Sequence, residues 1–192
     1  MVFSACYRTL LSDYLLKLHT MHPRFAPGII FSLILLFAAC NTTKKSANKP
    51  DAPARASSTA NMQLRNRVVT YAQKYVGSPY KYAGTSPSGF DCSGFTSYVL
   101  KEFNVKASPA SAIQAKEGRA VSIDKVKPGD LVFFGENSKH ISHVAMVVKR
   151  SKDGIVCVHS TTSRGVIVEN VSTSTYWKPK ILFARDVISP KS

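Results

Sequence analysis

The sequence predicts an α+β domain over residues 62–189, with helices first and an antiparallel β-sheet after them. Two patterns support this class. Apolar residues recur at helical spacing in 62–76 and 91–103, whereas short β-branched runs separated by turn residues follow Pro128-Gly129-Asp130. Helices followed by a block of strands are typical of α+β proteins. The composition, 44% hydrophobic and 19% charged over 192 residues, suits a folded chain.

The N-terminus predicts export. Residues 29–39, IIFSLILLFAA, are the only long apolar run, and this run is far shorter than the roughly 20 residues that cross a bilayer. Arg24 precedes the run and the small pair Ala38-Ala39 ends it, as in a secretory signal peptide over 1–39. Such a signal begins shortly before its apolar core, so we expect translation to start at Met21.

Cys40 follows the small pair directly, which resembles the bacterial lipobox. In a lipobox the cysteine is lipidated and becomes the first residue of the mature protein, so the segment predicts a lipid anchor at Cys40. A plain signal peptide and a buried apolar helix are the alternatives. Residues 41–61 contain no aromatic residue and no Val, Ile or Leu, and they are predicted to be a flexible linker.

The charge does not indicate nucleic-acid binding. The whole chain carries +15, and residues 62–189 hold 18 basic and 9 acidic residues, a net charge of +9. An exported domain rarely meets DNA or RNA, and the basic residues are not interleaved with aromatic ones as in nucleic-acid platforms. This charge suits binding to an anionic cell wall or to lipid headgroups. A basic surface that faces only solvent explains the charge equally well.

Each element has its own signal. Leu64, Val68 and Tyr71 lie near helical spacing in 62–76, and Gly77 ends that helix. A loop rich in glycine and proline follows over 77–90. Asp91 then caps a helix over 91–103, and a short helix is expected within 111–117. The predicted strands span 131–134, 143–149, 154–160, 165–171 and 181–188.

Cys92 is the candidate reactive residue. It lies in the first turn of the 91–103 helix, where unpaired N–H groups and the helix dipole favour a thiolate and can bind an oxyanion. Gly89 and Gly94 remove bulk on either side, which is expected to let a substrate backbone approach. The alternative is a core cysteine that only fills space. The negative charge of Asp91 disfavours a thiolate at Cys92, unless the Asp91 carboxylate is engaged in capping the helix.

A nucleophilic cysteine needs a base, usually a histidine. His143 opens one predicted strand and His159 closes the next, with a turn at 151–154 between them. A hairpin symmetric about Ser151 places the two histidines directly opposite and on one face, with Cβ atoms about 5 Å apart. One ring is then available as the base toward Cys92, and the other orients it.

Other readings of these residues stay open. Two strand histidines also suit a hydrogen-bonded core pair. A metal site from Cys92, His143 and His159 is the less favoured alternative, because their spacing matches no zinc motif; no metal is expected. His140 is expected on the surface in a polar loop, and Cys157 is expected to be a small buried residue.

Four segments stand in order along 62–188: GSPYKYAGTSPSGFDCSGFTSYVL (77–100), PGDLVFF (128–134), HVAMVV (143–148) and VCVHSTTSRGVIV (156–168). Together they resemble the NlpC/P60 family of papain-like cysteine peptidases. The resemblance implies a papain-like α+β fold, with the catalytic cysteine at a helix start packed on a small antiparallel sheet. It implies Cys92 as the nucleophile, His143 as the base, His159 as the residue that orients the base, and Tyr80 near the oxyanion site.

The family hydrolyses amide bonds in the stem peptides of peptidoglycan. The tail YWKPKILFARDVI (176–188) resembles the short lipoprotein murein endopeptidases of the family. Some members cut the D-alanine–meso-diaminopimelate crosslink and others the γ-D-glutamate–diaminopimelate bond, and the sequence does not decide between them. Two departures stand out: Ala110 replaces an arginine that many relatives carry, and Ala83-Gly84 replaces a double glycine.

The sequence thus predicts a lipid-anchored cysteine endopeptidase of the cell wall. Its expected partners are stem peptides and membrane lipid, without nucleic acid or cofactor, and its oligomeric state stays open. The resemblance, and Asn41 rather than aspartate after Cys40, favour the outer membrane facing the periplasm. The rivals are a non-catalytic wall-binding lipoprotein and a papain-like acyltransferase or amidase on a non-wall substrate.

Overall fold

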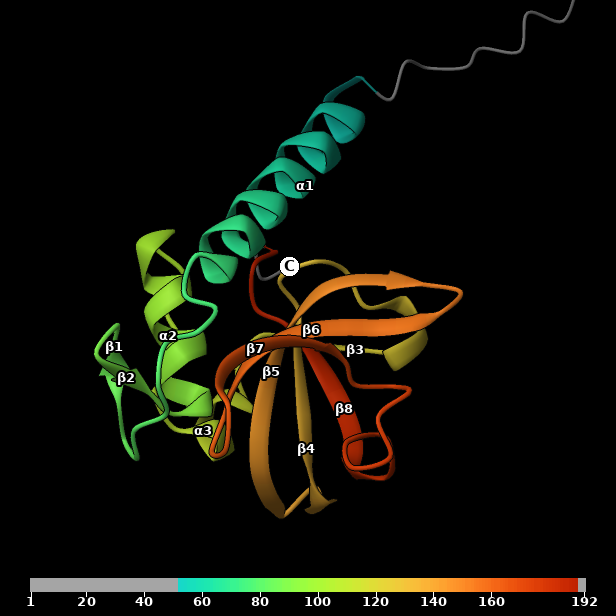
Figure 1. Cartoon of the computed structure of the whole chain (residues 1–192). Coiled ribbons are helices and arrows are strands. Elements are labelled where there is room, and N and C mark those ends of the chain that lie inside the picture. Colours follow the sequence, from blue (N-terminus) through green and yellow to red (C-terminus); the bar gives the residue numbers. More distant parts are fainter. Residues whose placement is uncertain (1–51, 190–192) are drawn as a thin grey trace, which may run out of the picture. The chain divides into compact units, whose positions relative to one another are not determined.

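A computed structural model describes residues 52–189 (Figure 1). The predicted signal peptide 1–39, the start at Met21, Cys40 and residues 41–51 of the predicted linker lie outside the described residues. The helices are α1 (Ala52–Gln73), α2 (Cys92–Glu102), α3 (Ser111–Gln114) and the short 3₁₀ turns η1 (Ile123–Lys125) and η2 (Lys178–Lys180). The strands are β1 (Thr85–Ser86), β2 (Gly89–Phe90), β3 (Arg119–Val121), β4 (Leu131–Asn137), β5 (His140–Ser151), β6 (Gly154–Thr161), β7 (Gly165–Asn170) and β8 (Ile181–Asp186).

One antiparallel sheet dominates the α+β fold. Its strand order is β3-β8-β4-β5-β6-β7, and β1 and β2 form a separate pair. The five predicted strands and the predicted fold class are confirmed. The sequence did not reveal β3, β1 and β2, because strands of two or three residues are too short to show an alternating pattern. The sheet is also not a simple meander, since β8 returns to lie between β3 and β4.

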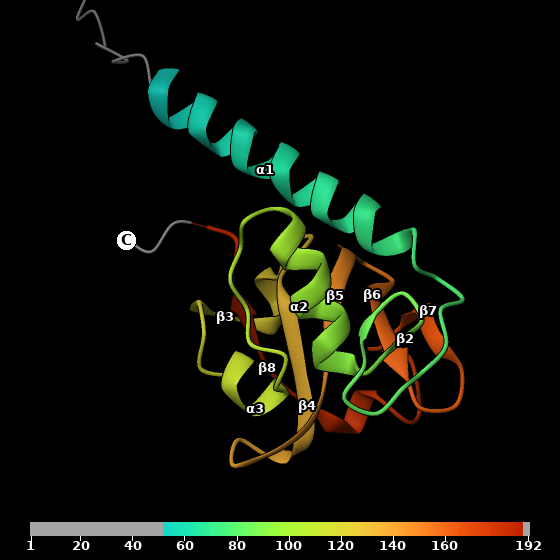
Figure 2. The same cartoon turned by 90° about the vertical axis from the view of Figure 1, so that its left-hand side faces the viewer.

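The two faces of the sheet carry separate cores. On one face, α1 and α2 cover Leu131, Phe133 and Met146 with side chains such as Val68 and Phe95. Figure 2 shows α2 and α3 lying across this face. On the other face, Val126, Val171 and Trp177 from loop segments cover Phe134, Ala145, Val147 and Cys157. Successive side chains of β4 and β5 alternate between the two cores, as the period of a strand requires.

The first helix is longer than predicted. α1 begins at Ala52, so the prediction of a flexible linker over 41–61 is wrong for residues 52–61. Residues 55–60 are exposed, in agreement with a segment too polar for a core. Alanine and arginine have high helix propensity, and a helix can extend beyond its packed part without any apolar face. Within 52–189, no helix is long and apolar enough to cross a membrane.

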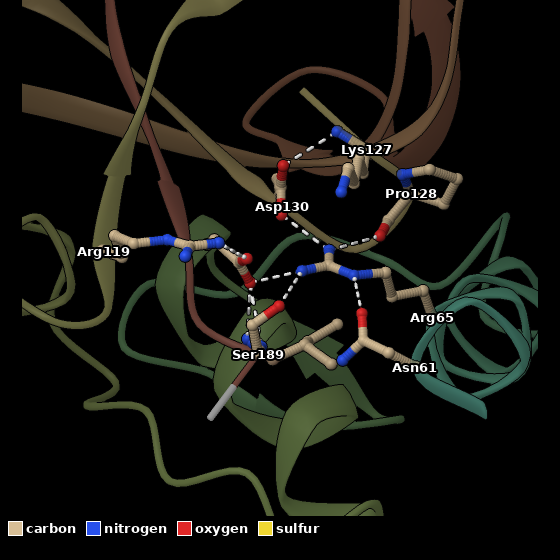
Figure 3. Close-up of polar contacts among 9 residues, drawn as sticks. Asn61, Arg65, Arg119, Lys127, Pro128, Asp130 and Ser189 are labelled. Atoms are coloured by element: carbon tan, nitrogen blue, oxygen red, sulfur yellow. Dashed lines mark hydrogen bonds and ion pairs between the residues drawn. The ribbon is translucent and has the colours of Figure 1, made fainter. Parts of the chain in front are cut away.

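A buried arginine ties α1 to the sheet (Figure 3). Arg65 has no exposed surface, and its guanidinium forms ion pairs with Asp130 before β4 and Asp186 at the end of β8. It also donates hydrogen bonds to the oxygens of three further residues: Asn61, Pro128 and Ser189. This network holds α1 against the ends of two central strands.

Candidate active site

Cys92 is the first residue of α2, as predicted. The Asp91 side chain accepts a hydrogen bond from the Gly94 backbone N–H at 2.6 Å, which is the geometry of an N-cap. Ser93 also donates its hydroxyl to the Asp91 carboxylate, at 3.2 Å. The charge of Asp91 is therefore used at the start of the helix, next to the sulfur of Cys92.

The glycines around Cys92 have a different purpose from the one predicted. A Cβ atom on Gly94 would lie 2.1 Å from the Gly84 carbonyl oxygen, and one on Gly89 would lie 2.6 Å from the Lys81 Cβ atom. These glycines let the 77–90 loop pack closely on α2 and on itself. The expectation that they admit a substrate backbone is wrong, because the neighbouring chain fills the space.

Burial governs the acidity of the Cys92 thiol. Burial raises the pKa of Cys92, and the nearby charge of Asp91 raises it further. Backbone N–H groups of Val144 and Ser93 oppose this by stabilising the thiolate, without overcoming the burial. A helix start alone was expected to favour the thiolate. In the folded domain the thiol is instead neutral at neutral pH, so attack by Cys92 needs a base.

The two predicted histidines are hydrogen-bonded to each other. His143 Nε2 lies 2.8 Å from His159 Nδ1, and the ring planes make an angle of 70°. His143 is on β5 and His159 is on β6, so the hairpin brings them together. His159 is fully buried behind His143, which keeps 8% of its surface exposed.

The predicted pairing of these strands was wrong. The turn spans 151–154 as predicted, but Ser151 pairs with Gly154, so the hairpin is centred after Lys152 rather than on Ser151, and a β-bulge lies between Val147 and Lys149. Met146 therefore pairs with Val158 rather than with Val156, a shift of two residues. A shift of two leaves each side chain on its predicted face, whereas a shift of one would have turned it over. The histidines are thus diagonal neighbours rather than directly opposed.

One pocket of about 1200 Å³ brings the predicted site together. Tyr80, Cys92 and His143 all line it, while His159 supports His143 from behind. No hydrogen bond joins Cys92 to His143 among the contacts of the described residues. Catalytic hydrogen bonds often tighten only when substrate is bound, so this geometry is compatible with proton transfer between them.

The remaining candidates also have clear positions. His140 is exposed and contacts Asn137 Oδ1 at 3.2 Å, which confirms the prediction of a surface residue. Cys157 is fully buried in the second core, also as predicted. In the described part of the chain, His, Cys, Asp and Glu side chains form no group of three that could hold a metal ion.

Glu169 and Trp177 complete the site, and sequence reasoning missed both. Glu169 Oε1 accepts hydrogen bonds from Trp177 Nε1 at 3.0 Å and from Arg164 at 2.8 Å, and it lies 3.0 Å from His159 Nε2. The Trp177 ring also stacks on His143, with centroids 4.5 Å apart. An acidic residue within the apolar run VIVEN of β7 was a signal for Glu169. Nothing local marked Trp177, since its position depends on the loop after β7.

The charges of this cluster follow from its surroundings. Burial lowers the pKa of His143 well below its usual 6.5, and it lowers the pKa of His159 to about 4. Burial alone would raise the pKa of Glu169, but hydrogen bonds from Arg164 and Trp177 outweigh this and lower it. At neutral pH both imidazoles are therefore neutral and the Glu169 carboxylate is ionised.

Comparison with known proteins identifies the family. Residues 77–186, more than half of the chain, match the sequence signature of the NlpC/P60 family. This chain belongs to the NlpC/P60 family. Among NlpC/P60 relatives, a Bacillus subtilis protein named gamma-DL-glutamyl hydrolase is 36% identical over 124 residues. That match covers 62% of this chain and 29% of the relative.

Two further NlpC/P60 proteins resemble more of the chain or its fold. The Escherichia coli K12 protein named murein DD-endopeptidase MepS/murein LD-carboxypeptidase is 28% identical over 181 residues, covering 86% of this chain and 93% of that protein. The crystal structure of the NlpC/p60 domain of the peptidoglycan hydrolase SagA is 32% identical, with a TM-score of 0.55. It covers 64% of this chain and 97% of that domain. The chain spans under a third of its B. subtilis relative and of the Listeria proteins named probable endopeptidase p60.

Proposed function

We propose that this protein is a peptidoglycan endopeptidase that hydrolyses amide bonds in murein stem peptides with a cysteine nucleophile. One observation carries the proposal: Cys92, at the start of α2, lines the same pocket as His143, which is hydrogen-bonded to His159. A cysteine, a base and a residue that orients the base are the parts of a cysteine peptidase site. The names of the E. coli and SagA relatives support the choice of substrate.

The proposed reaction has two halves. The Cys92 sulfur attacks the scissile carbonyl carbon while His143 takes the thiol proton, and the Cys92 backbone N–H and Tyr80 hold the oxyanion. The carbon–nitrogen bond then breaks, and His143 gives its proton to the leaving amine. In the second half, His143 takes a proton from water as the water oxygen attacks the acyl-enzyme. The carbon–sulfur bond then breaks and His143 returns the proton to the sulfur, which restores the thiol. The acid product gives its proton to solvent and leaves as a carboxylate.

The neutral state of the histidine pair suits this scheme. Because burial keeps His143 unprotonated at neutral pH, its ring can accept the thiol proton as the carbon–sulfur bond forms. His159 then keeps the ring of His143 in place through the contact of 2.8 Å. Proton transfer during attack also fits a thiol whose own pKa is raised.

The test uses the purified full chain and its Cys92→Ala variant, with crosslinked and uncrosslinked muropeptides analysed by mass spectrometry. We expect the wild type to release products and the variant to lose about 10⁶-fold in kcat, the loss typical of removing a nucleophile. Monomers released from crosslinked dimers would indicate cleavage at D-alanine–meso-diaminopimelate. Cleavage after γ-D-glutamate would indicate the other bond.

Cys157→Ala is the matched control. Its thiol is fully buried in the second core, so this variant should keep the turnover of the wild type although it melts at a lower temperature. Turnover that persists in Cys92→Ala would refute the mechanism. A wild type that binds muropeptides without cleaving them would favour the non-catalytic wall-binding protein, and cleavage of another amide would favour the acyltransferase or amidase.

We also propose that the protein is an exported lipoprotein anchored at Cys40 in the outer membrane, facing the periplasm. The apolar run 29–39, which ends in Ala38-Ala39 and is followed directly by Cys40, supports this. Mass spectrometry of the protein made in a bacterial host should give a mature N-terminus at a lipidated Cys40, with Cys40→Ala unlipidated. A precursor peptide upstream of Met21, or an unmodified Cys40, would contradict these expectations.

A further inference from the structure

We propose that Glu169 is a positioning residue: acting through His159, it determines which ring nitrogen of His143 is free to take the proton of Cys92. The inference rests on the proposed function for its catalytic consequence. Its structural part, the placement of two protons on two neutral histidines, stands on the contacts and does not need the catalytic role.

The first step is the set of donors around one oxygen. Glu169 Oε1 lies 3.0 Å from Trp177 Nε1 and 2.8 Å from an Arg164 guanidinium nitrogen. Neither of these nitrogens can accept a hydrogen bond, so Oε1 is an acceptor in both contacts. An ionised carboxylate has no proton to donate. The third contact, 3.0 Å to His159 Nε2, therefore has its proton on the histidine.

The second step carries this assignment to His143. A neutral imidazole has a single N–H, so His159 with a proton on Nε2 has an unprotonated Nδ1. That Nδ1 faces His143 Nε2 at 2.8 Å and can only accept from it. His143 therefore has its proton on Nε2, and its Nδ1 keeps a free lone pair. Nδ1 is then the nitrogen that takes the thiol proton.

The surroundings make this order hard to reverse. His159 is fully buried, and His143 and Trp177 are 8% and 9% exposed, so water has little access to the contact between the two histidines. Trp177 contacts the first and the last member of the series His143–His159–Glu169, since its ring stacks on His143 and its N–H donates to Glu169. A reversed order would leave His159 Nε2 without a proton against the carboxylate and would place a proton on His143 Nδ1.

The experiment compares three variants of the full chain. Glu169→Met keeps the length of the side chain but removes the acceptor, Glu169→Gln keeps an acceptor oxygen, and Glu102→Met is the matched control. Glu102 is exposed at the far end of α2 from Cys92. Nitrogen-15 NMR of labelled histidines reports which nitrogen carries the proton, and steady-state kinetics on muropeptides separate kcat from KM.

We expect the wild type, Glu169→Gln and Glu102→Met to hold the proton of His143 on Nε2. In Glu169→Met the proton moves to Nδ1, and kcat falls by about 10- to 100-fold with KM little changed, the range found when the hydrogen-bond partner of a metal-bound histidine is lost. A wild-type proton on His143 Nδ1, or an unchanged spectrum in Glu169→Met, would overturn the inference. Equal losses of kcat in Glu169→Met and Glu169→Gln would also overturn it. The spectra need no substrate, so a wild type that cleaves no muropeptide refutes the proposed function and leaves the assignment of the protons to be decided by NMR.

Discussion

Replacing His143 with glutamine is expected to lower kcat for muropeptide hydrolysis by about 10²- to 10⁴-fold, the usual contribution of a general base. Glutamine takes up no proton near neutral pH. The Cys92 thiol, whose pKa is raised, would then have no base to take its proton during attack. The side chain still fills much of the space beside Phe134 and Trp177. Kinetics and a melting curve of the same preparation would separate loss of chemistry from loss of fold.

The rate at which Cys92 is alkylated tests the role of His143 as its base without any substrate. Because burial raises the pKa of Cys92, the wild-type alkylation rate should still be rising above pH of about 8.5, the ordinary pKa of cysteine. His143→Gln should be alkylated more slowly than the wild type at neutral pH. His140→Gln is the control, since His140 is exposed and contacts Asn137. If the His143→Gln and His140→Gln variants were alkylated at the same rate, His143 would have no part in activating Cys92.

Replacing Arg65 with methionine is expected to lower the free energy of unfolding by about 3–5 kcal/mol, the cost of breaking a buried ion pair. The change leaves Asp130, which is 1% exposed, without its cation. Among the described residues, Arg119 is then the one cation paired with Asp186, and its side chain is 63% exposed. Urea unfolding of the full chain measures the loss, and Arg67→Met is the control on the same helix. Arg67 is exposed and lies over the Phe103 ring, a contact worth about 0.5–1 kcal/mol.

The Asp186 carboxylate of this network predicts an acid limb in stability. Burial by itself would raise the pKa of Asp186, but hydrogen bonds from Ser189 and the charge of Arg65 outweigh it and lower the pKa to about 2. Folding therefore favours the ionised carboxylate. The stabilisation of the folded state by ionised Asp186 is complete above the unfolded pKa of about 3.9, and it is lost as pH falls toward 2. Arg65→Met should flatten that dependence, and an unchanged slope would show that Arg65 does not hold the charge of Asp186.

Local patterns predicted much of this fold. The cap at Asp91, the helix after it and the five longer strands were readable because each depends on residues close in sequence. The prediction failed where distant contacts decide. Residues 52–61 of the predicted linker form the start of α1. Gly89 and Gly94, which were expected to make room for substrate, instead allow close packing of the 77–90 loop. The strand register shifted by two residues because the hairpin is centred after Lys152 rather than on Ser151, and a β-bulge offsets part of that displacement.

The sequence by itself determined the class of the fold and the family, and it predicted Cys92, His143 and His159 as the principal site residues. These rest on motif order and on periodicities that every segment carries locally. Only the tertiary structure decided the state of those residues. Burial made the thiol and both imidazoles neutral, and the loop after β7 brought Trp177 against His143. Glu169 joined the site for the same reason: protonation and hydrogen-bond order depend on groups that meet only when distant segments pack together.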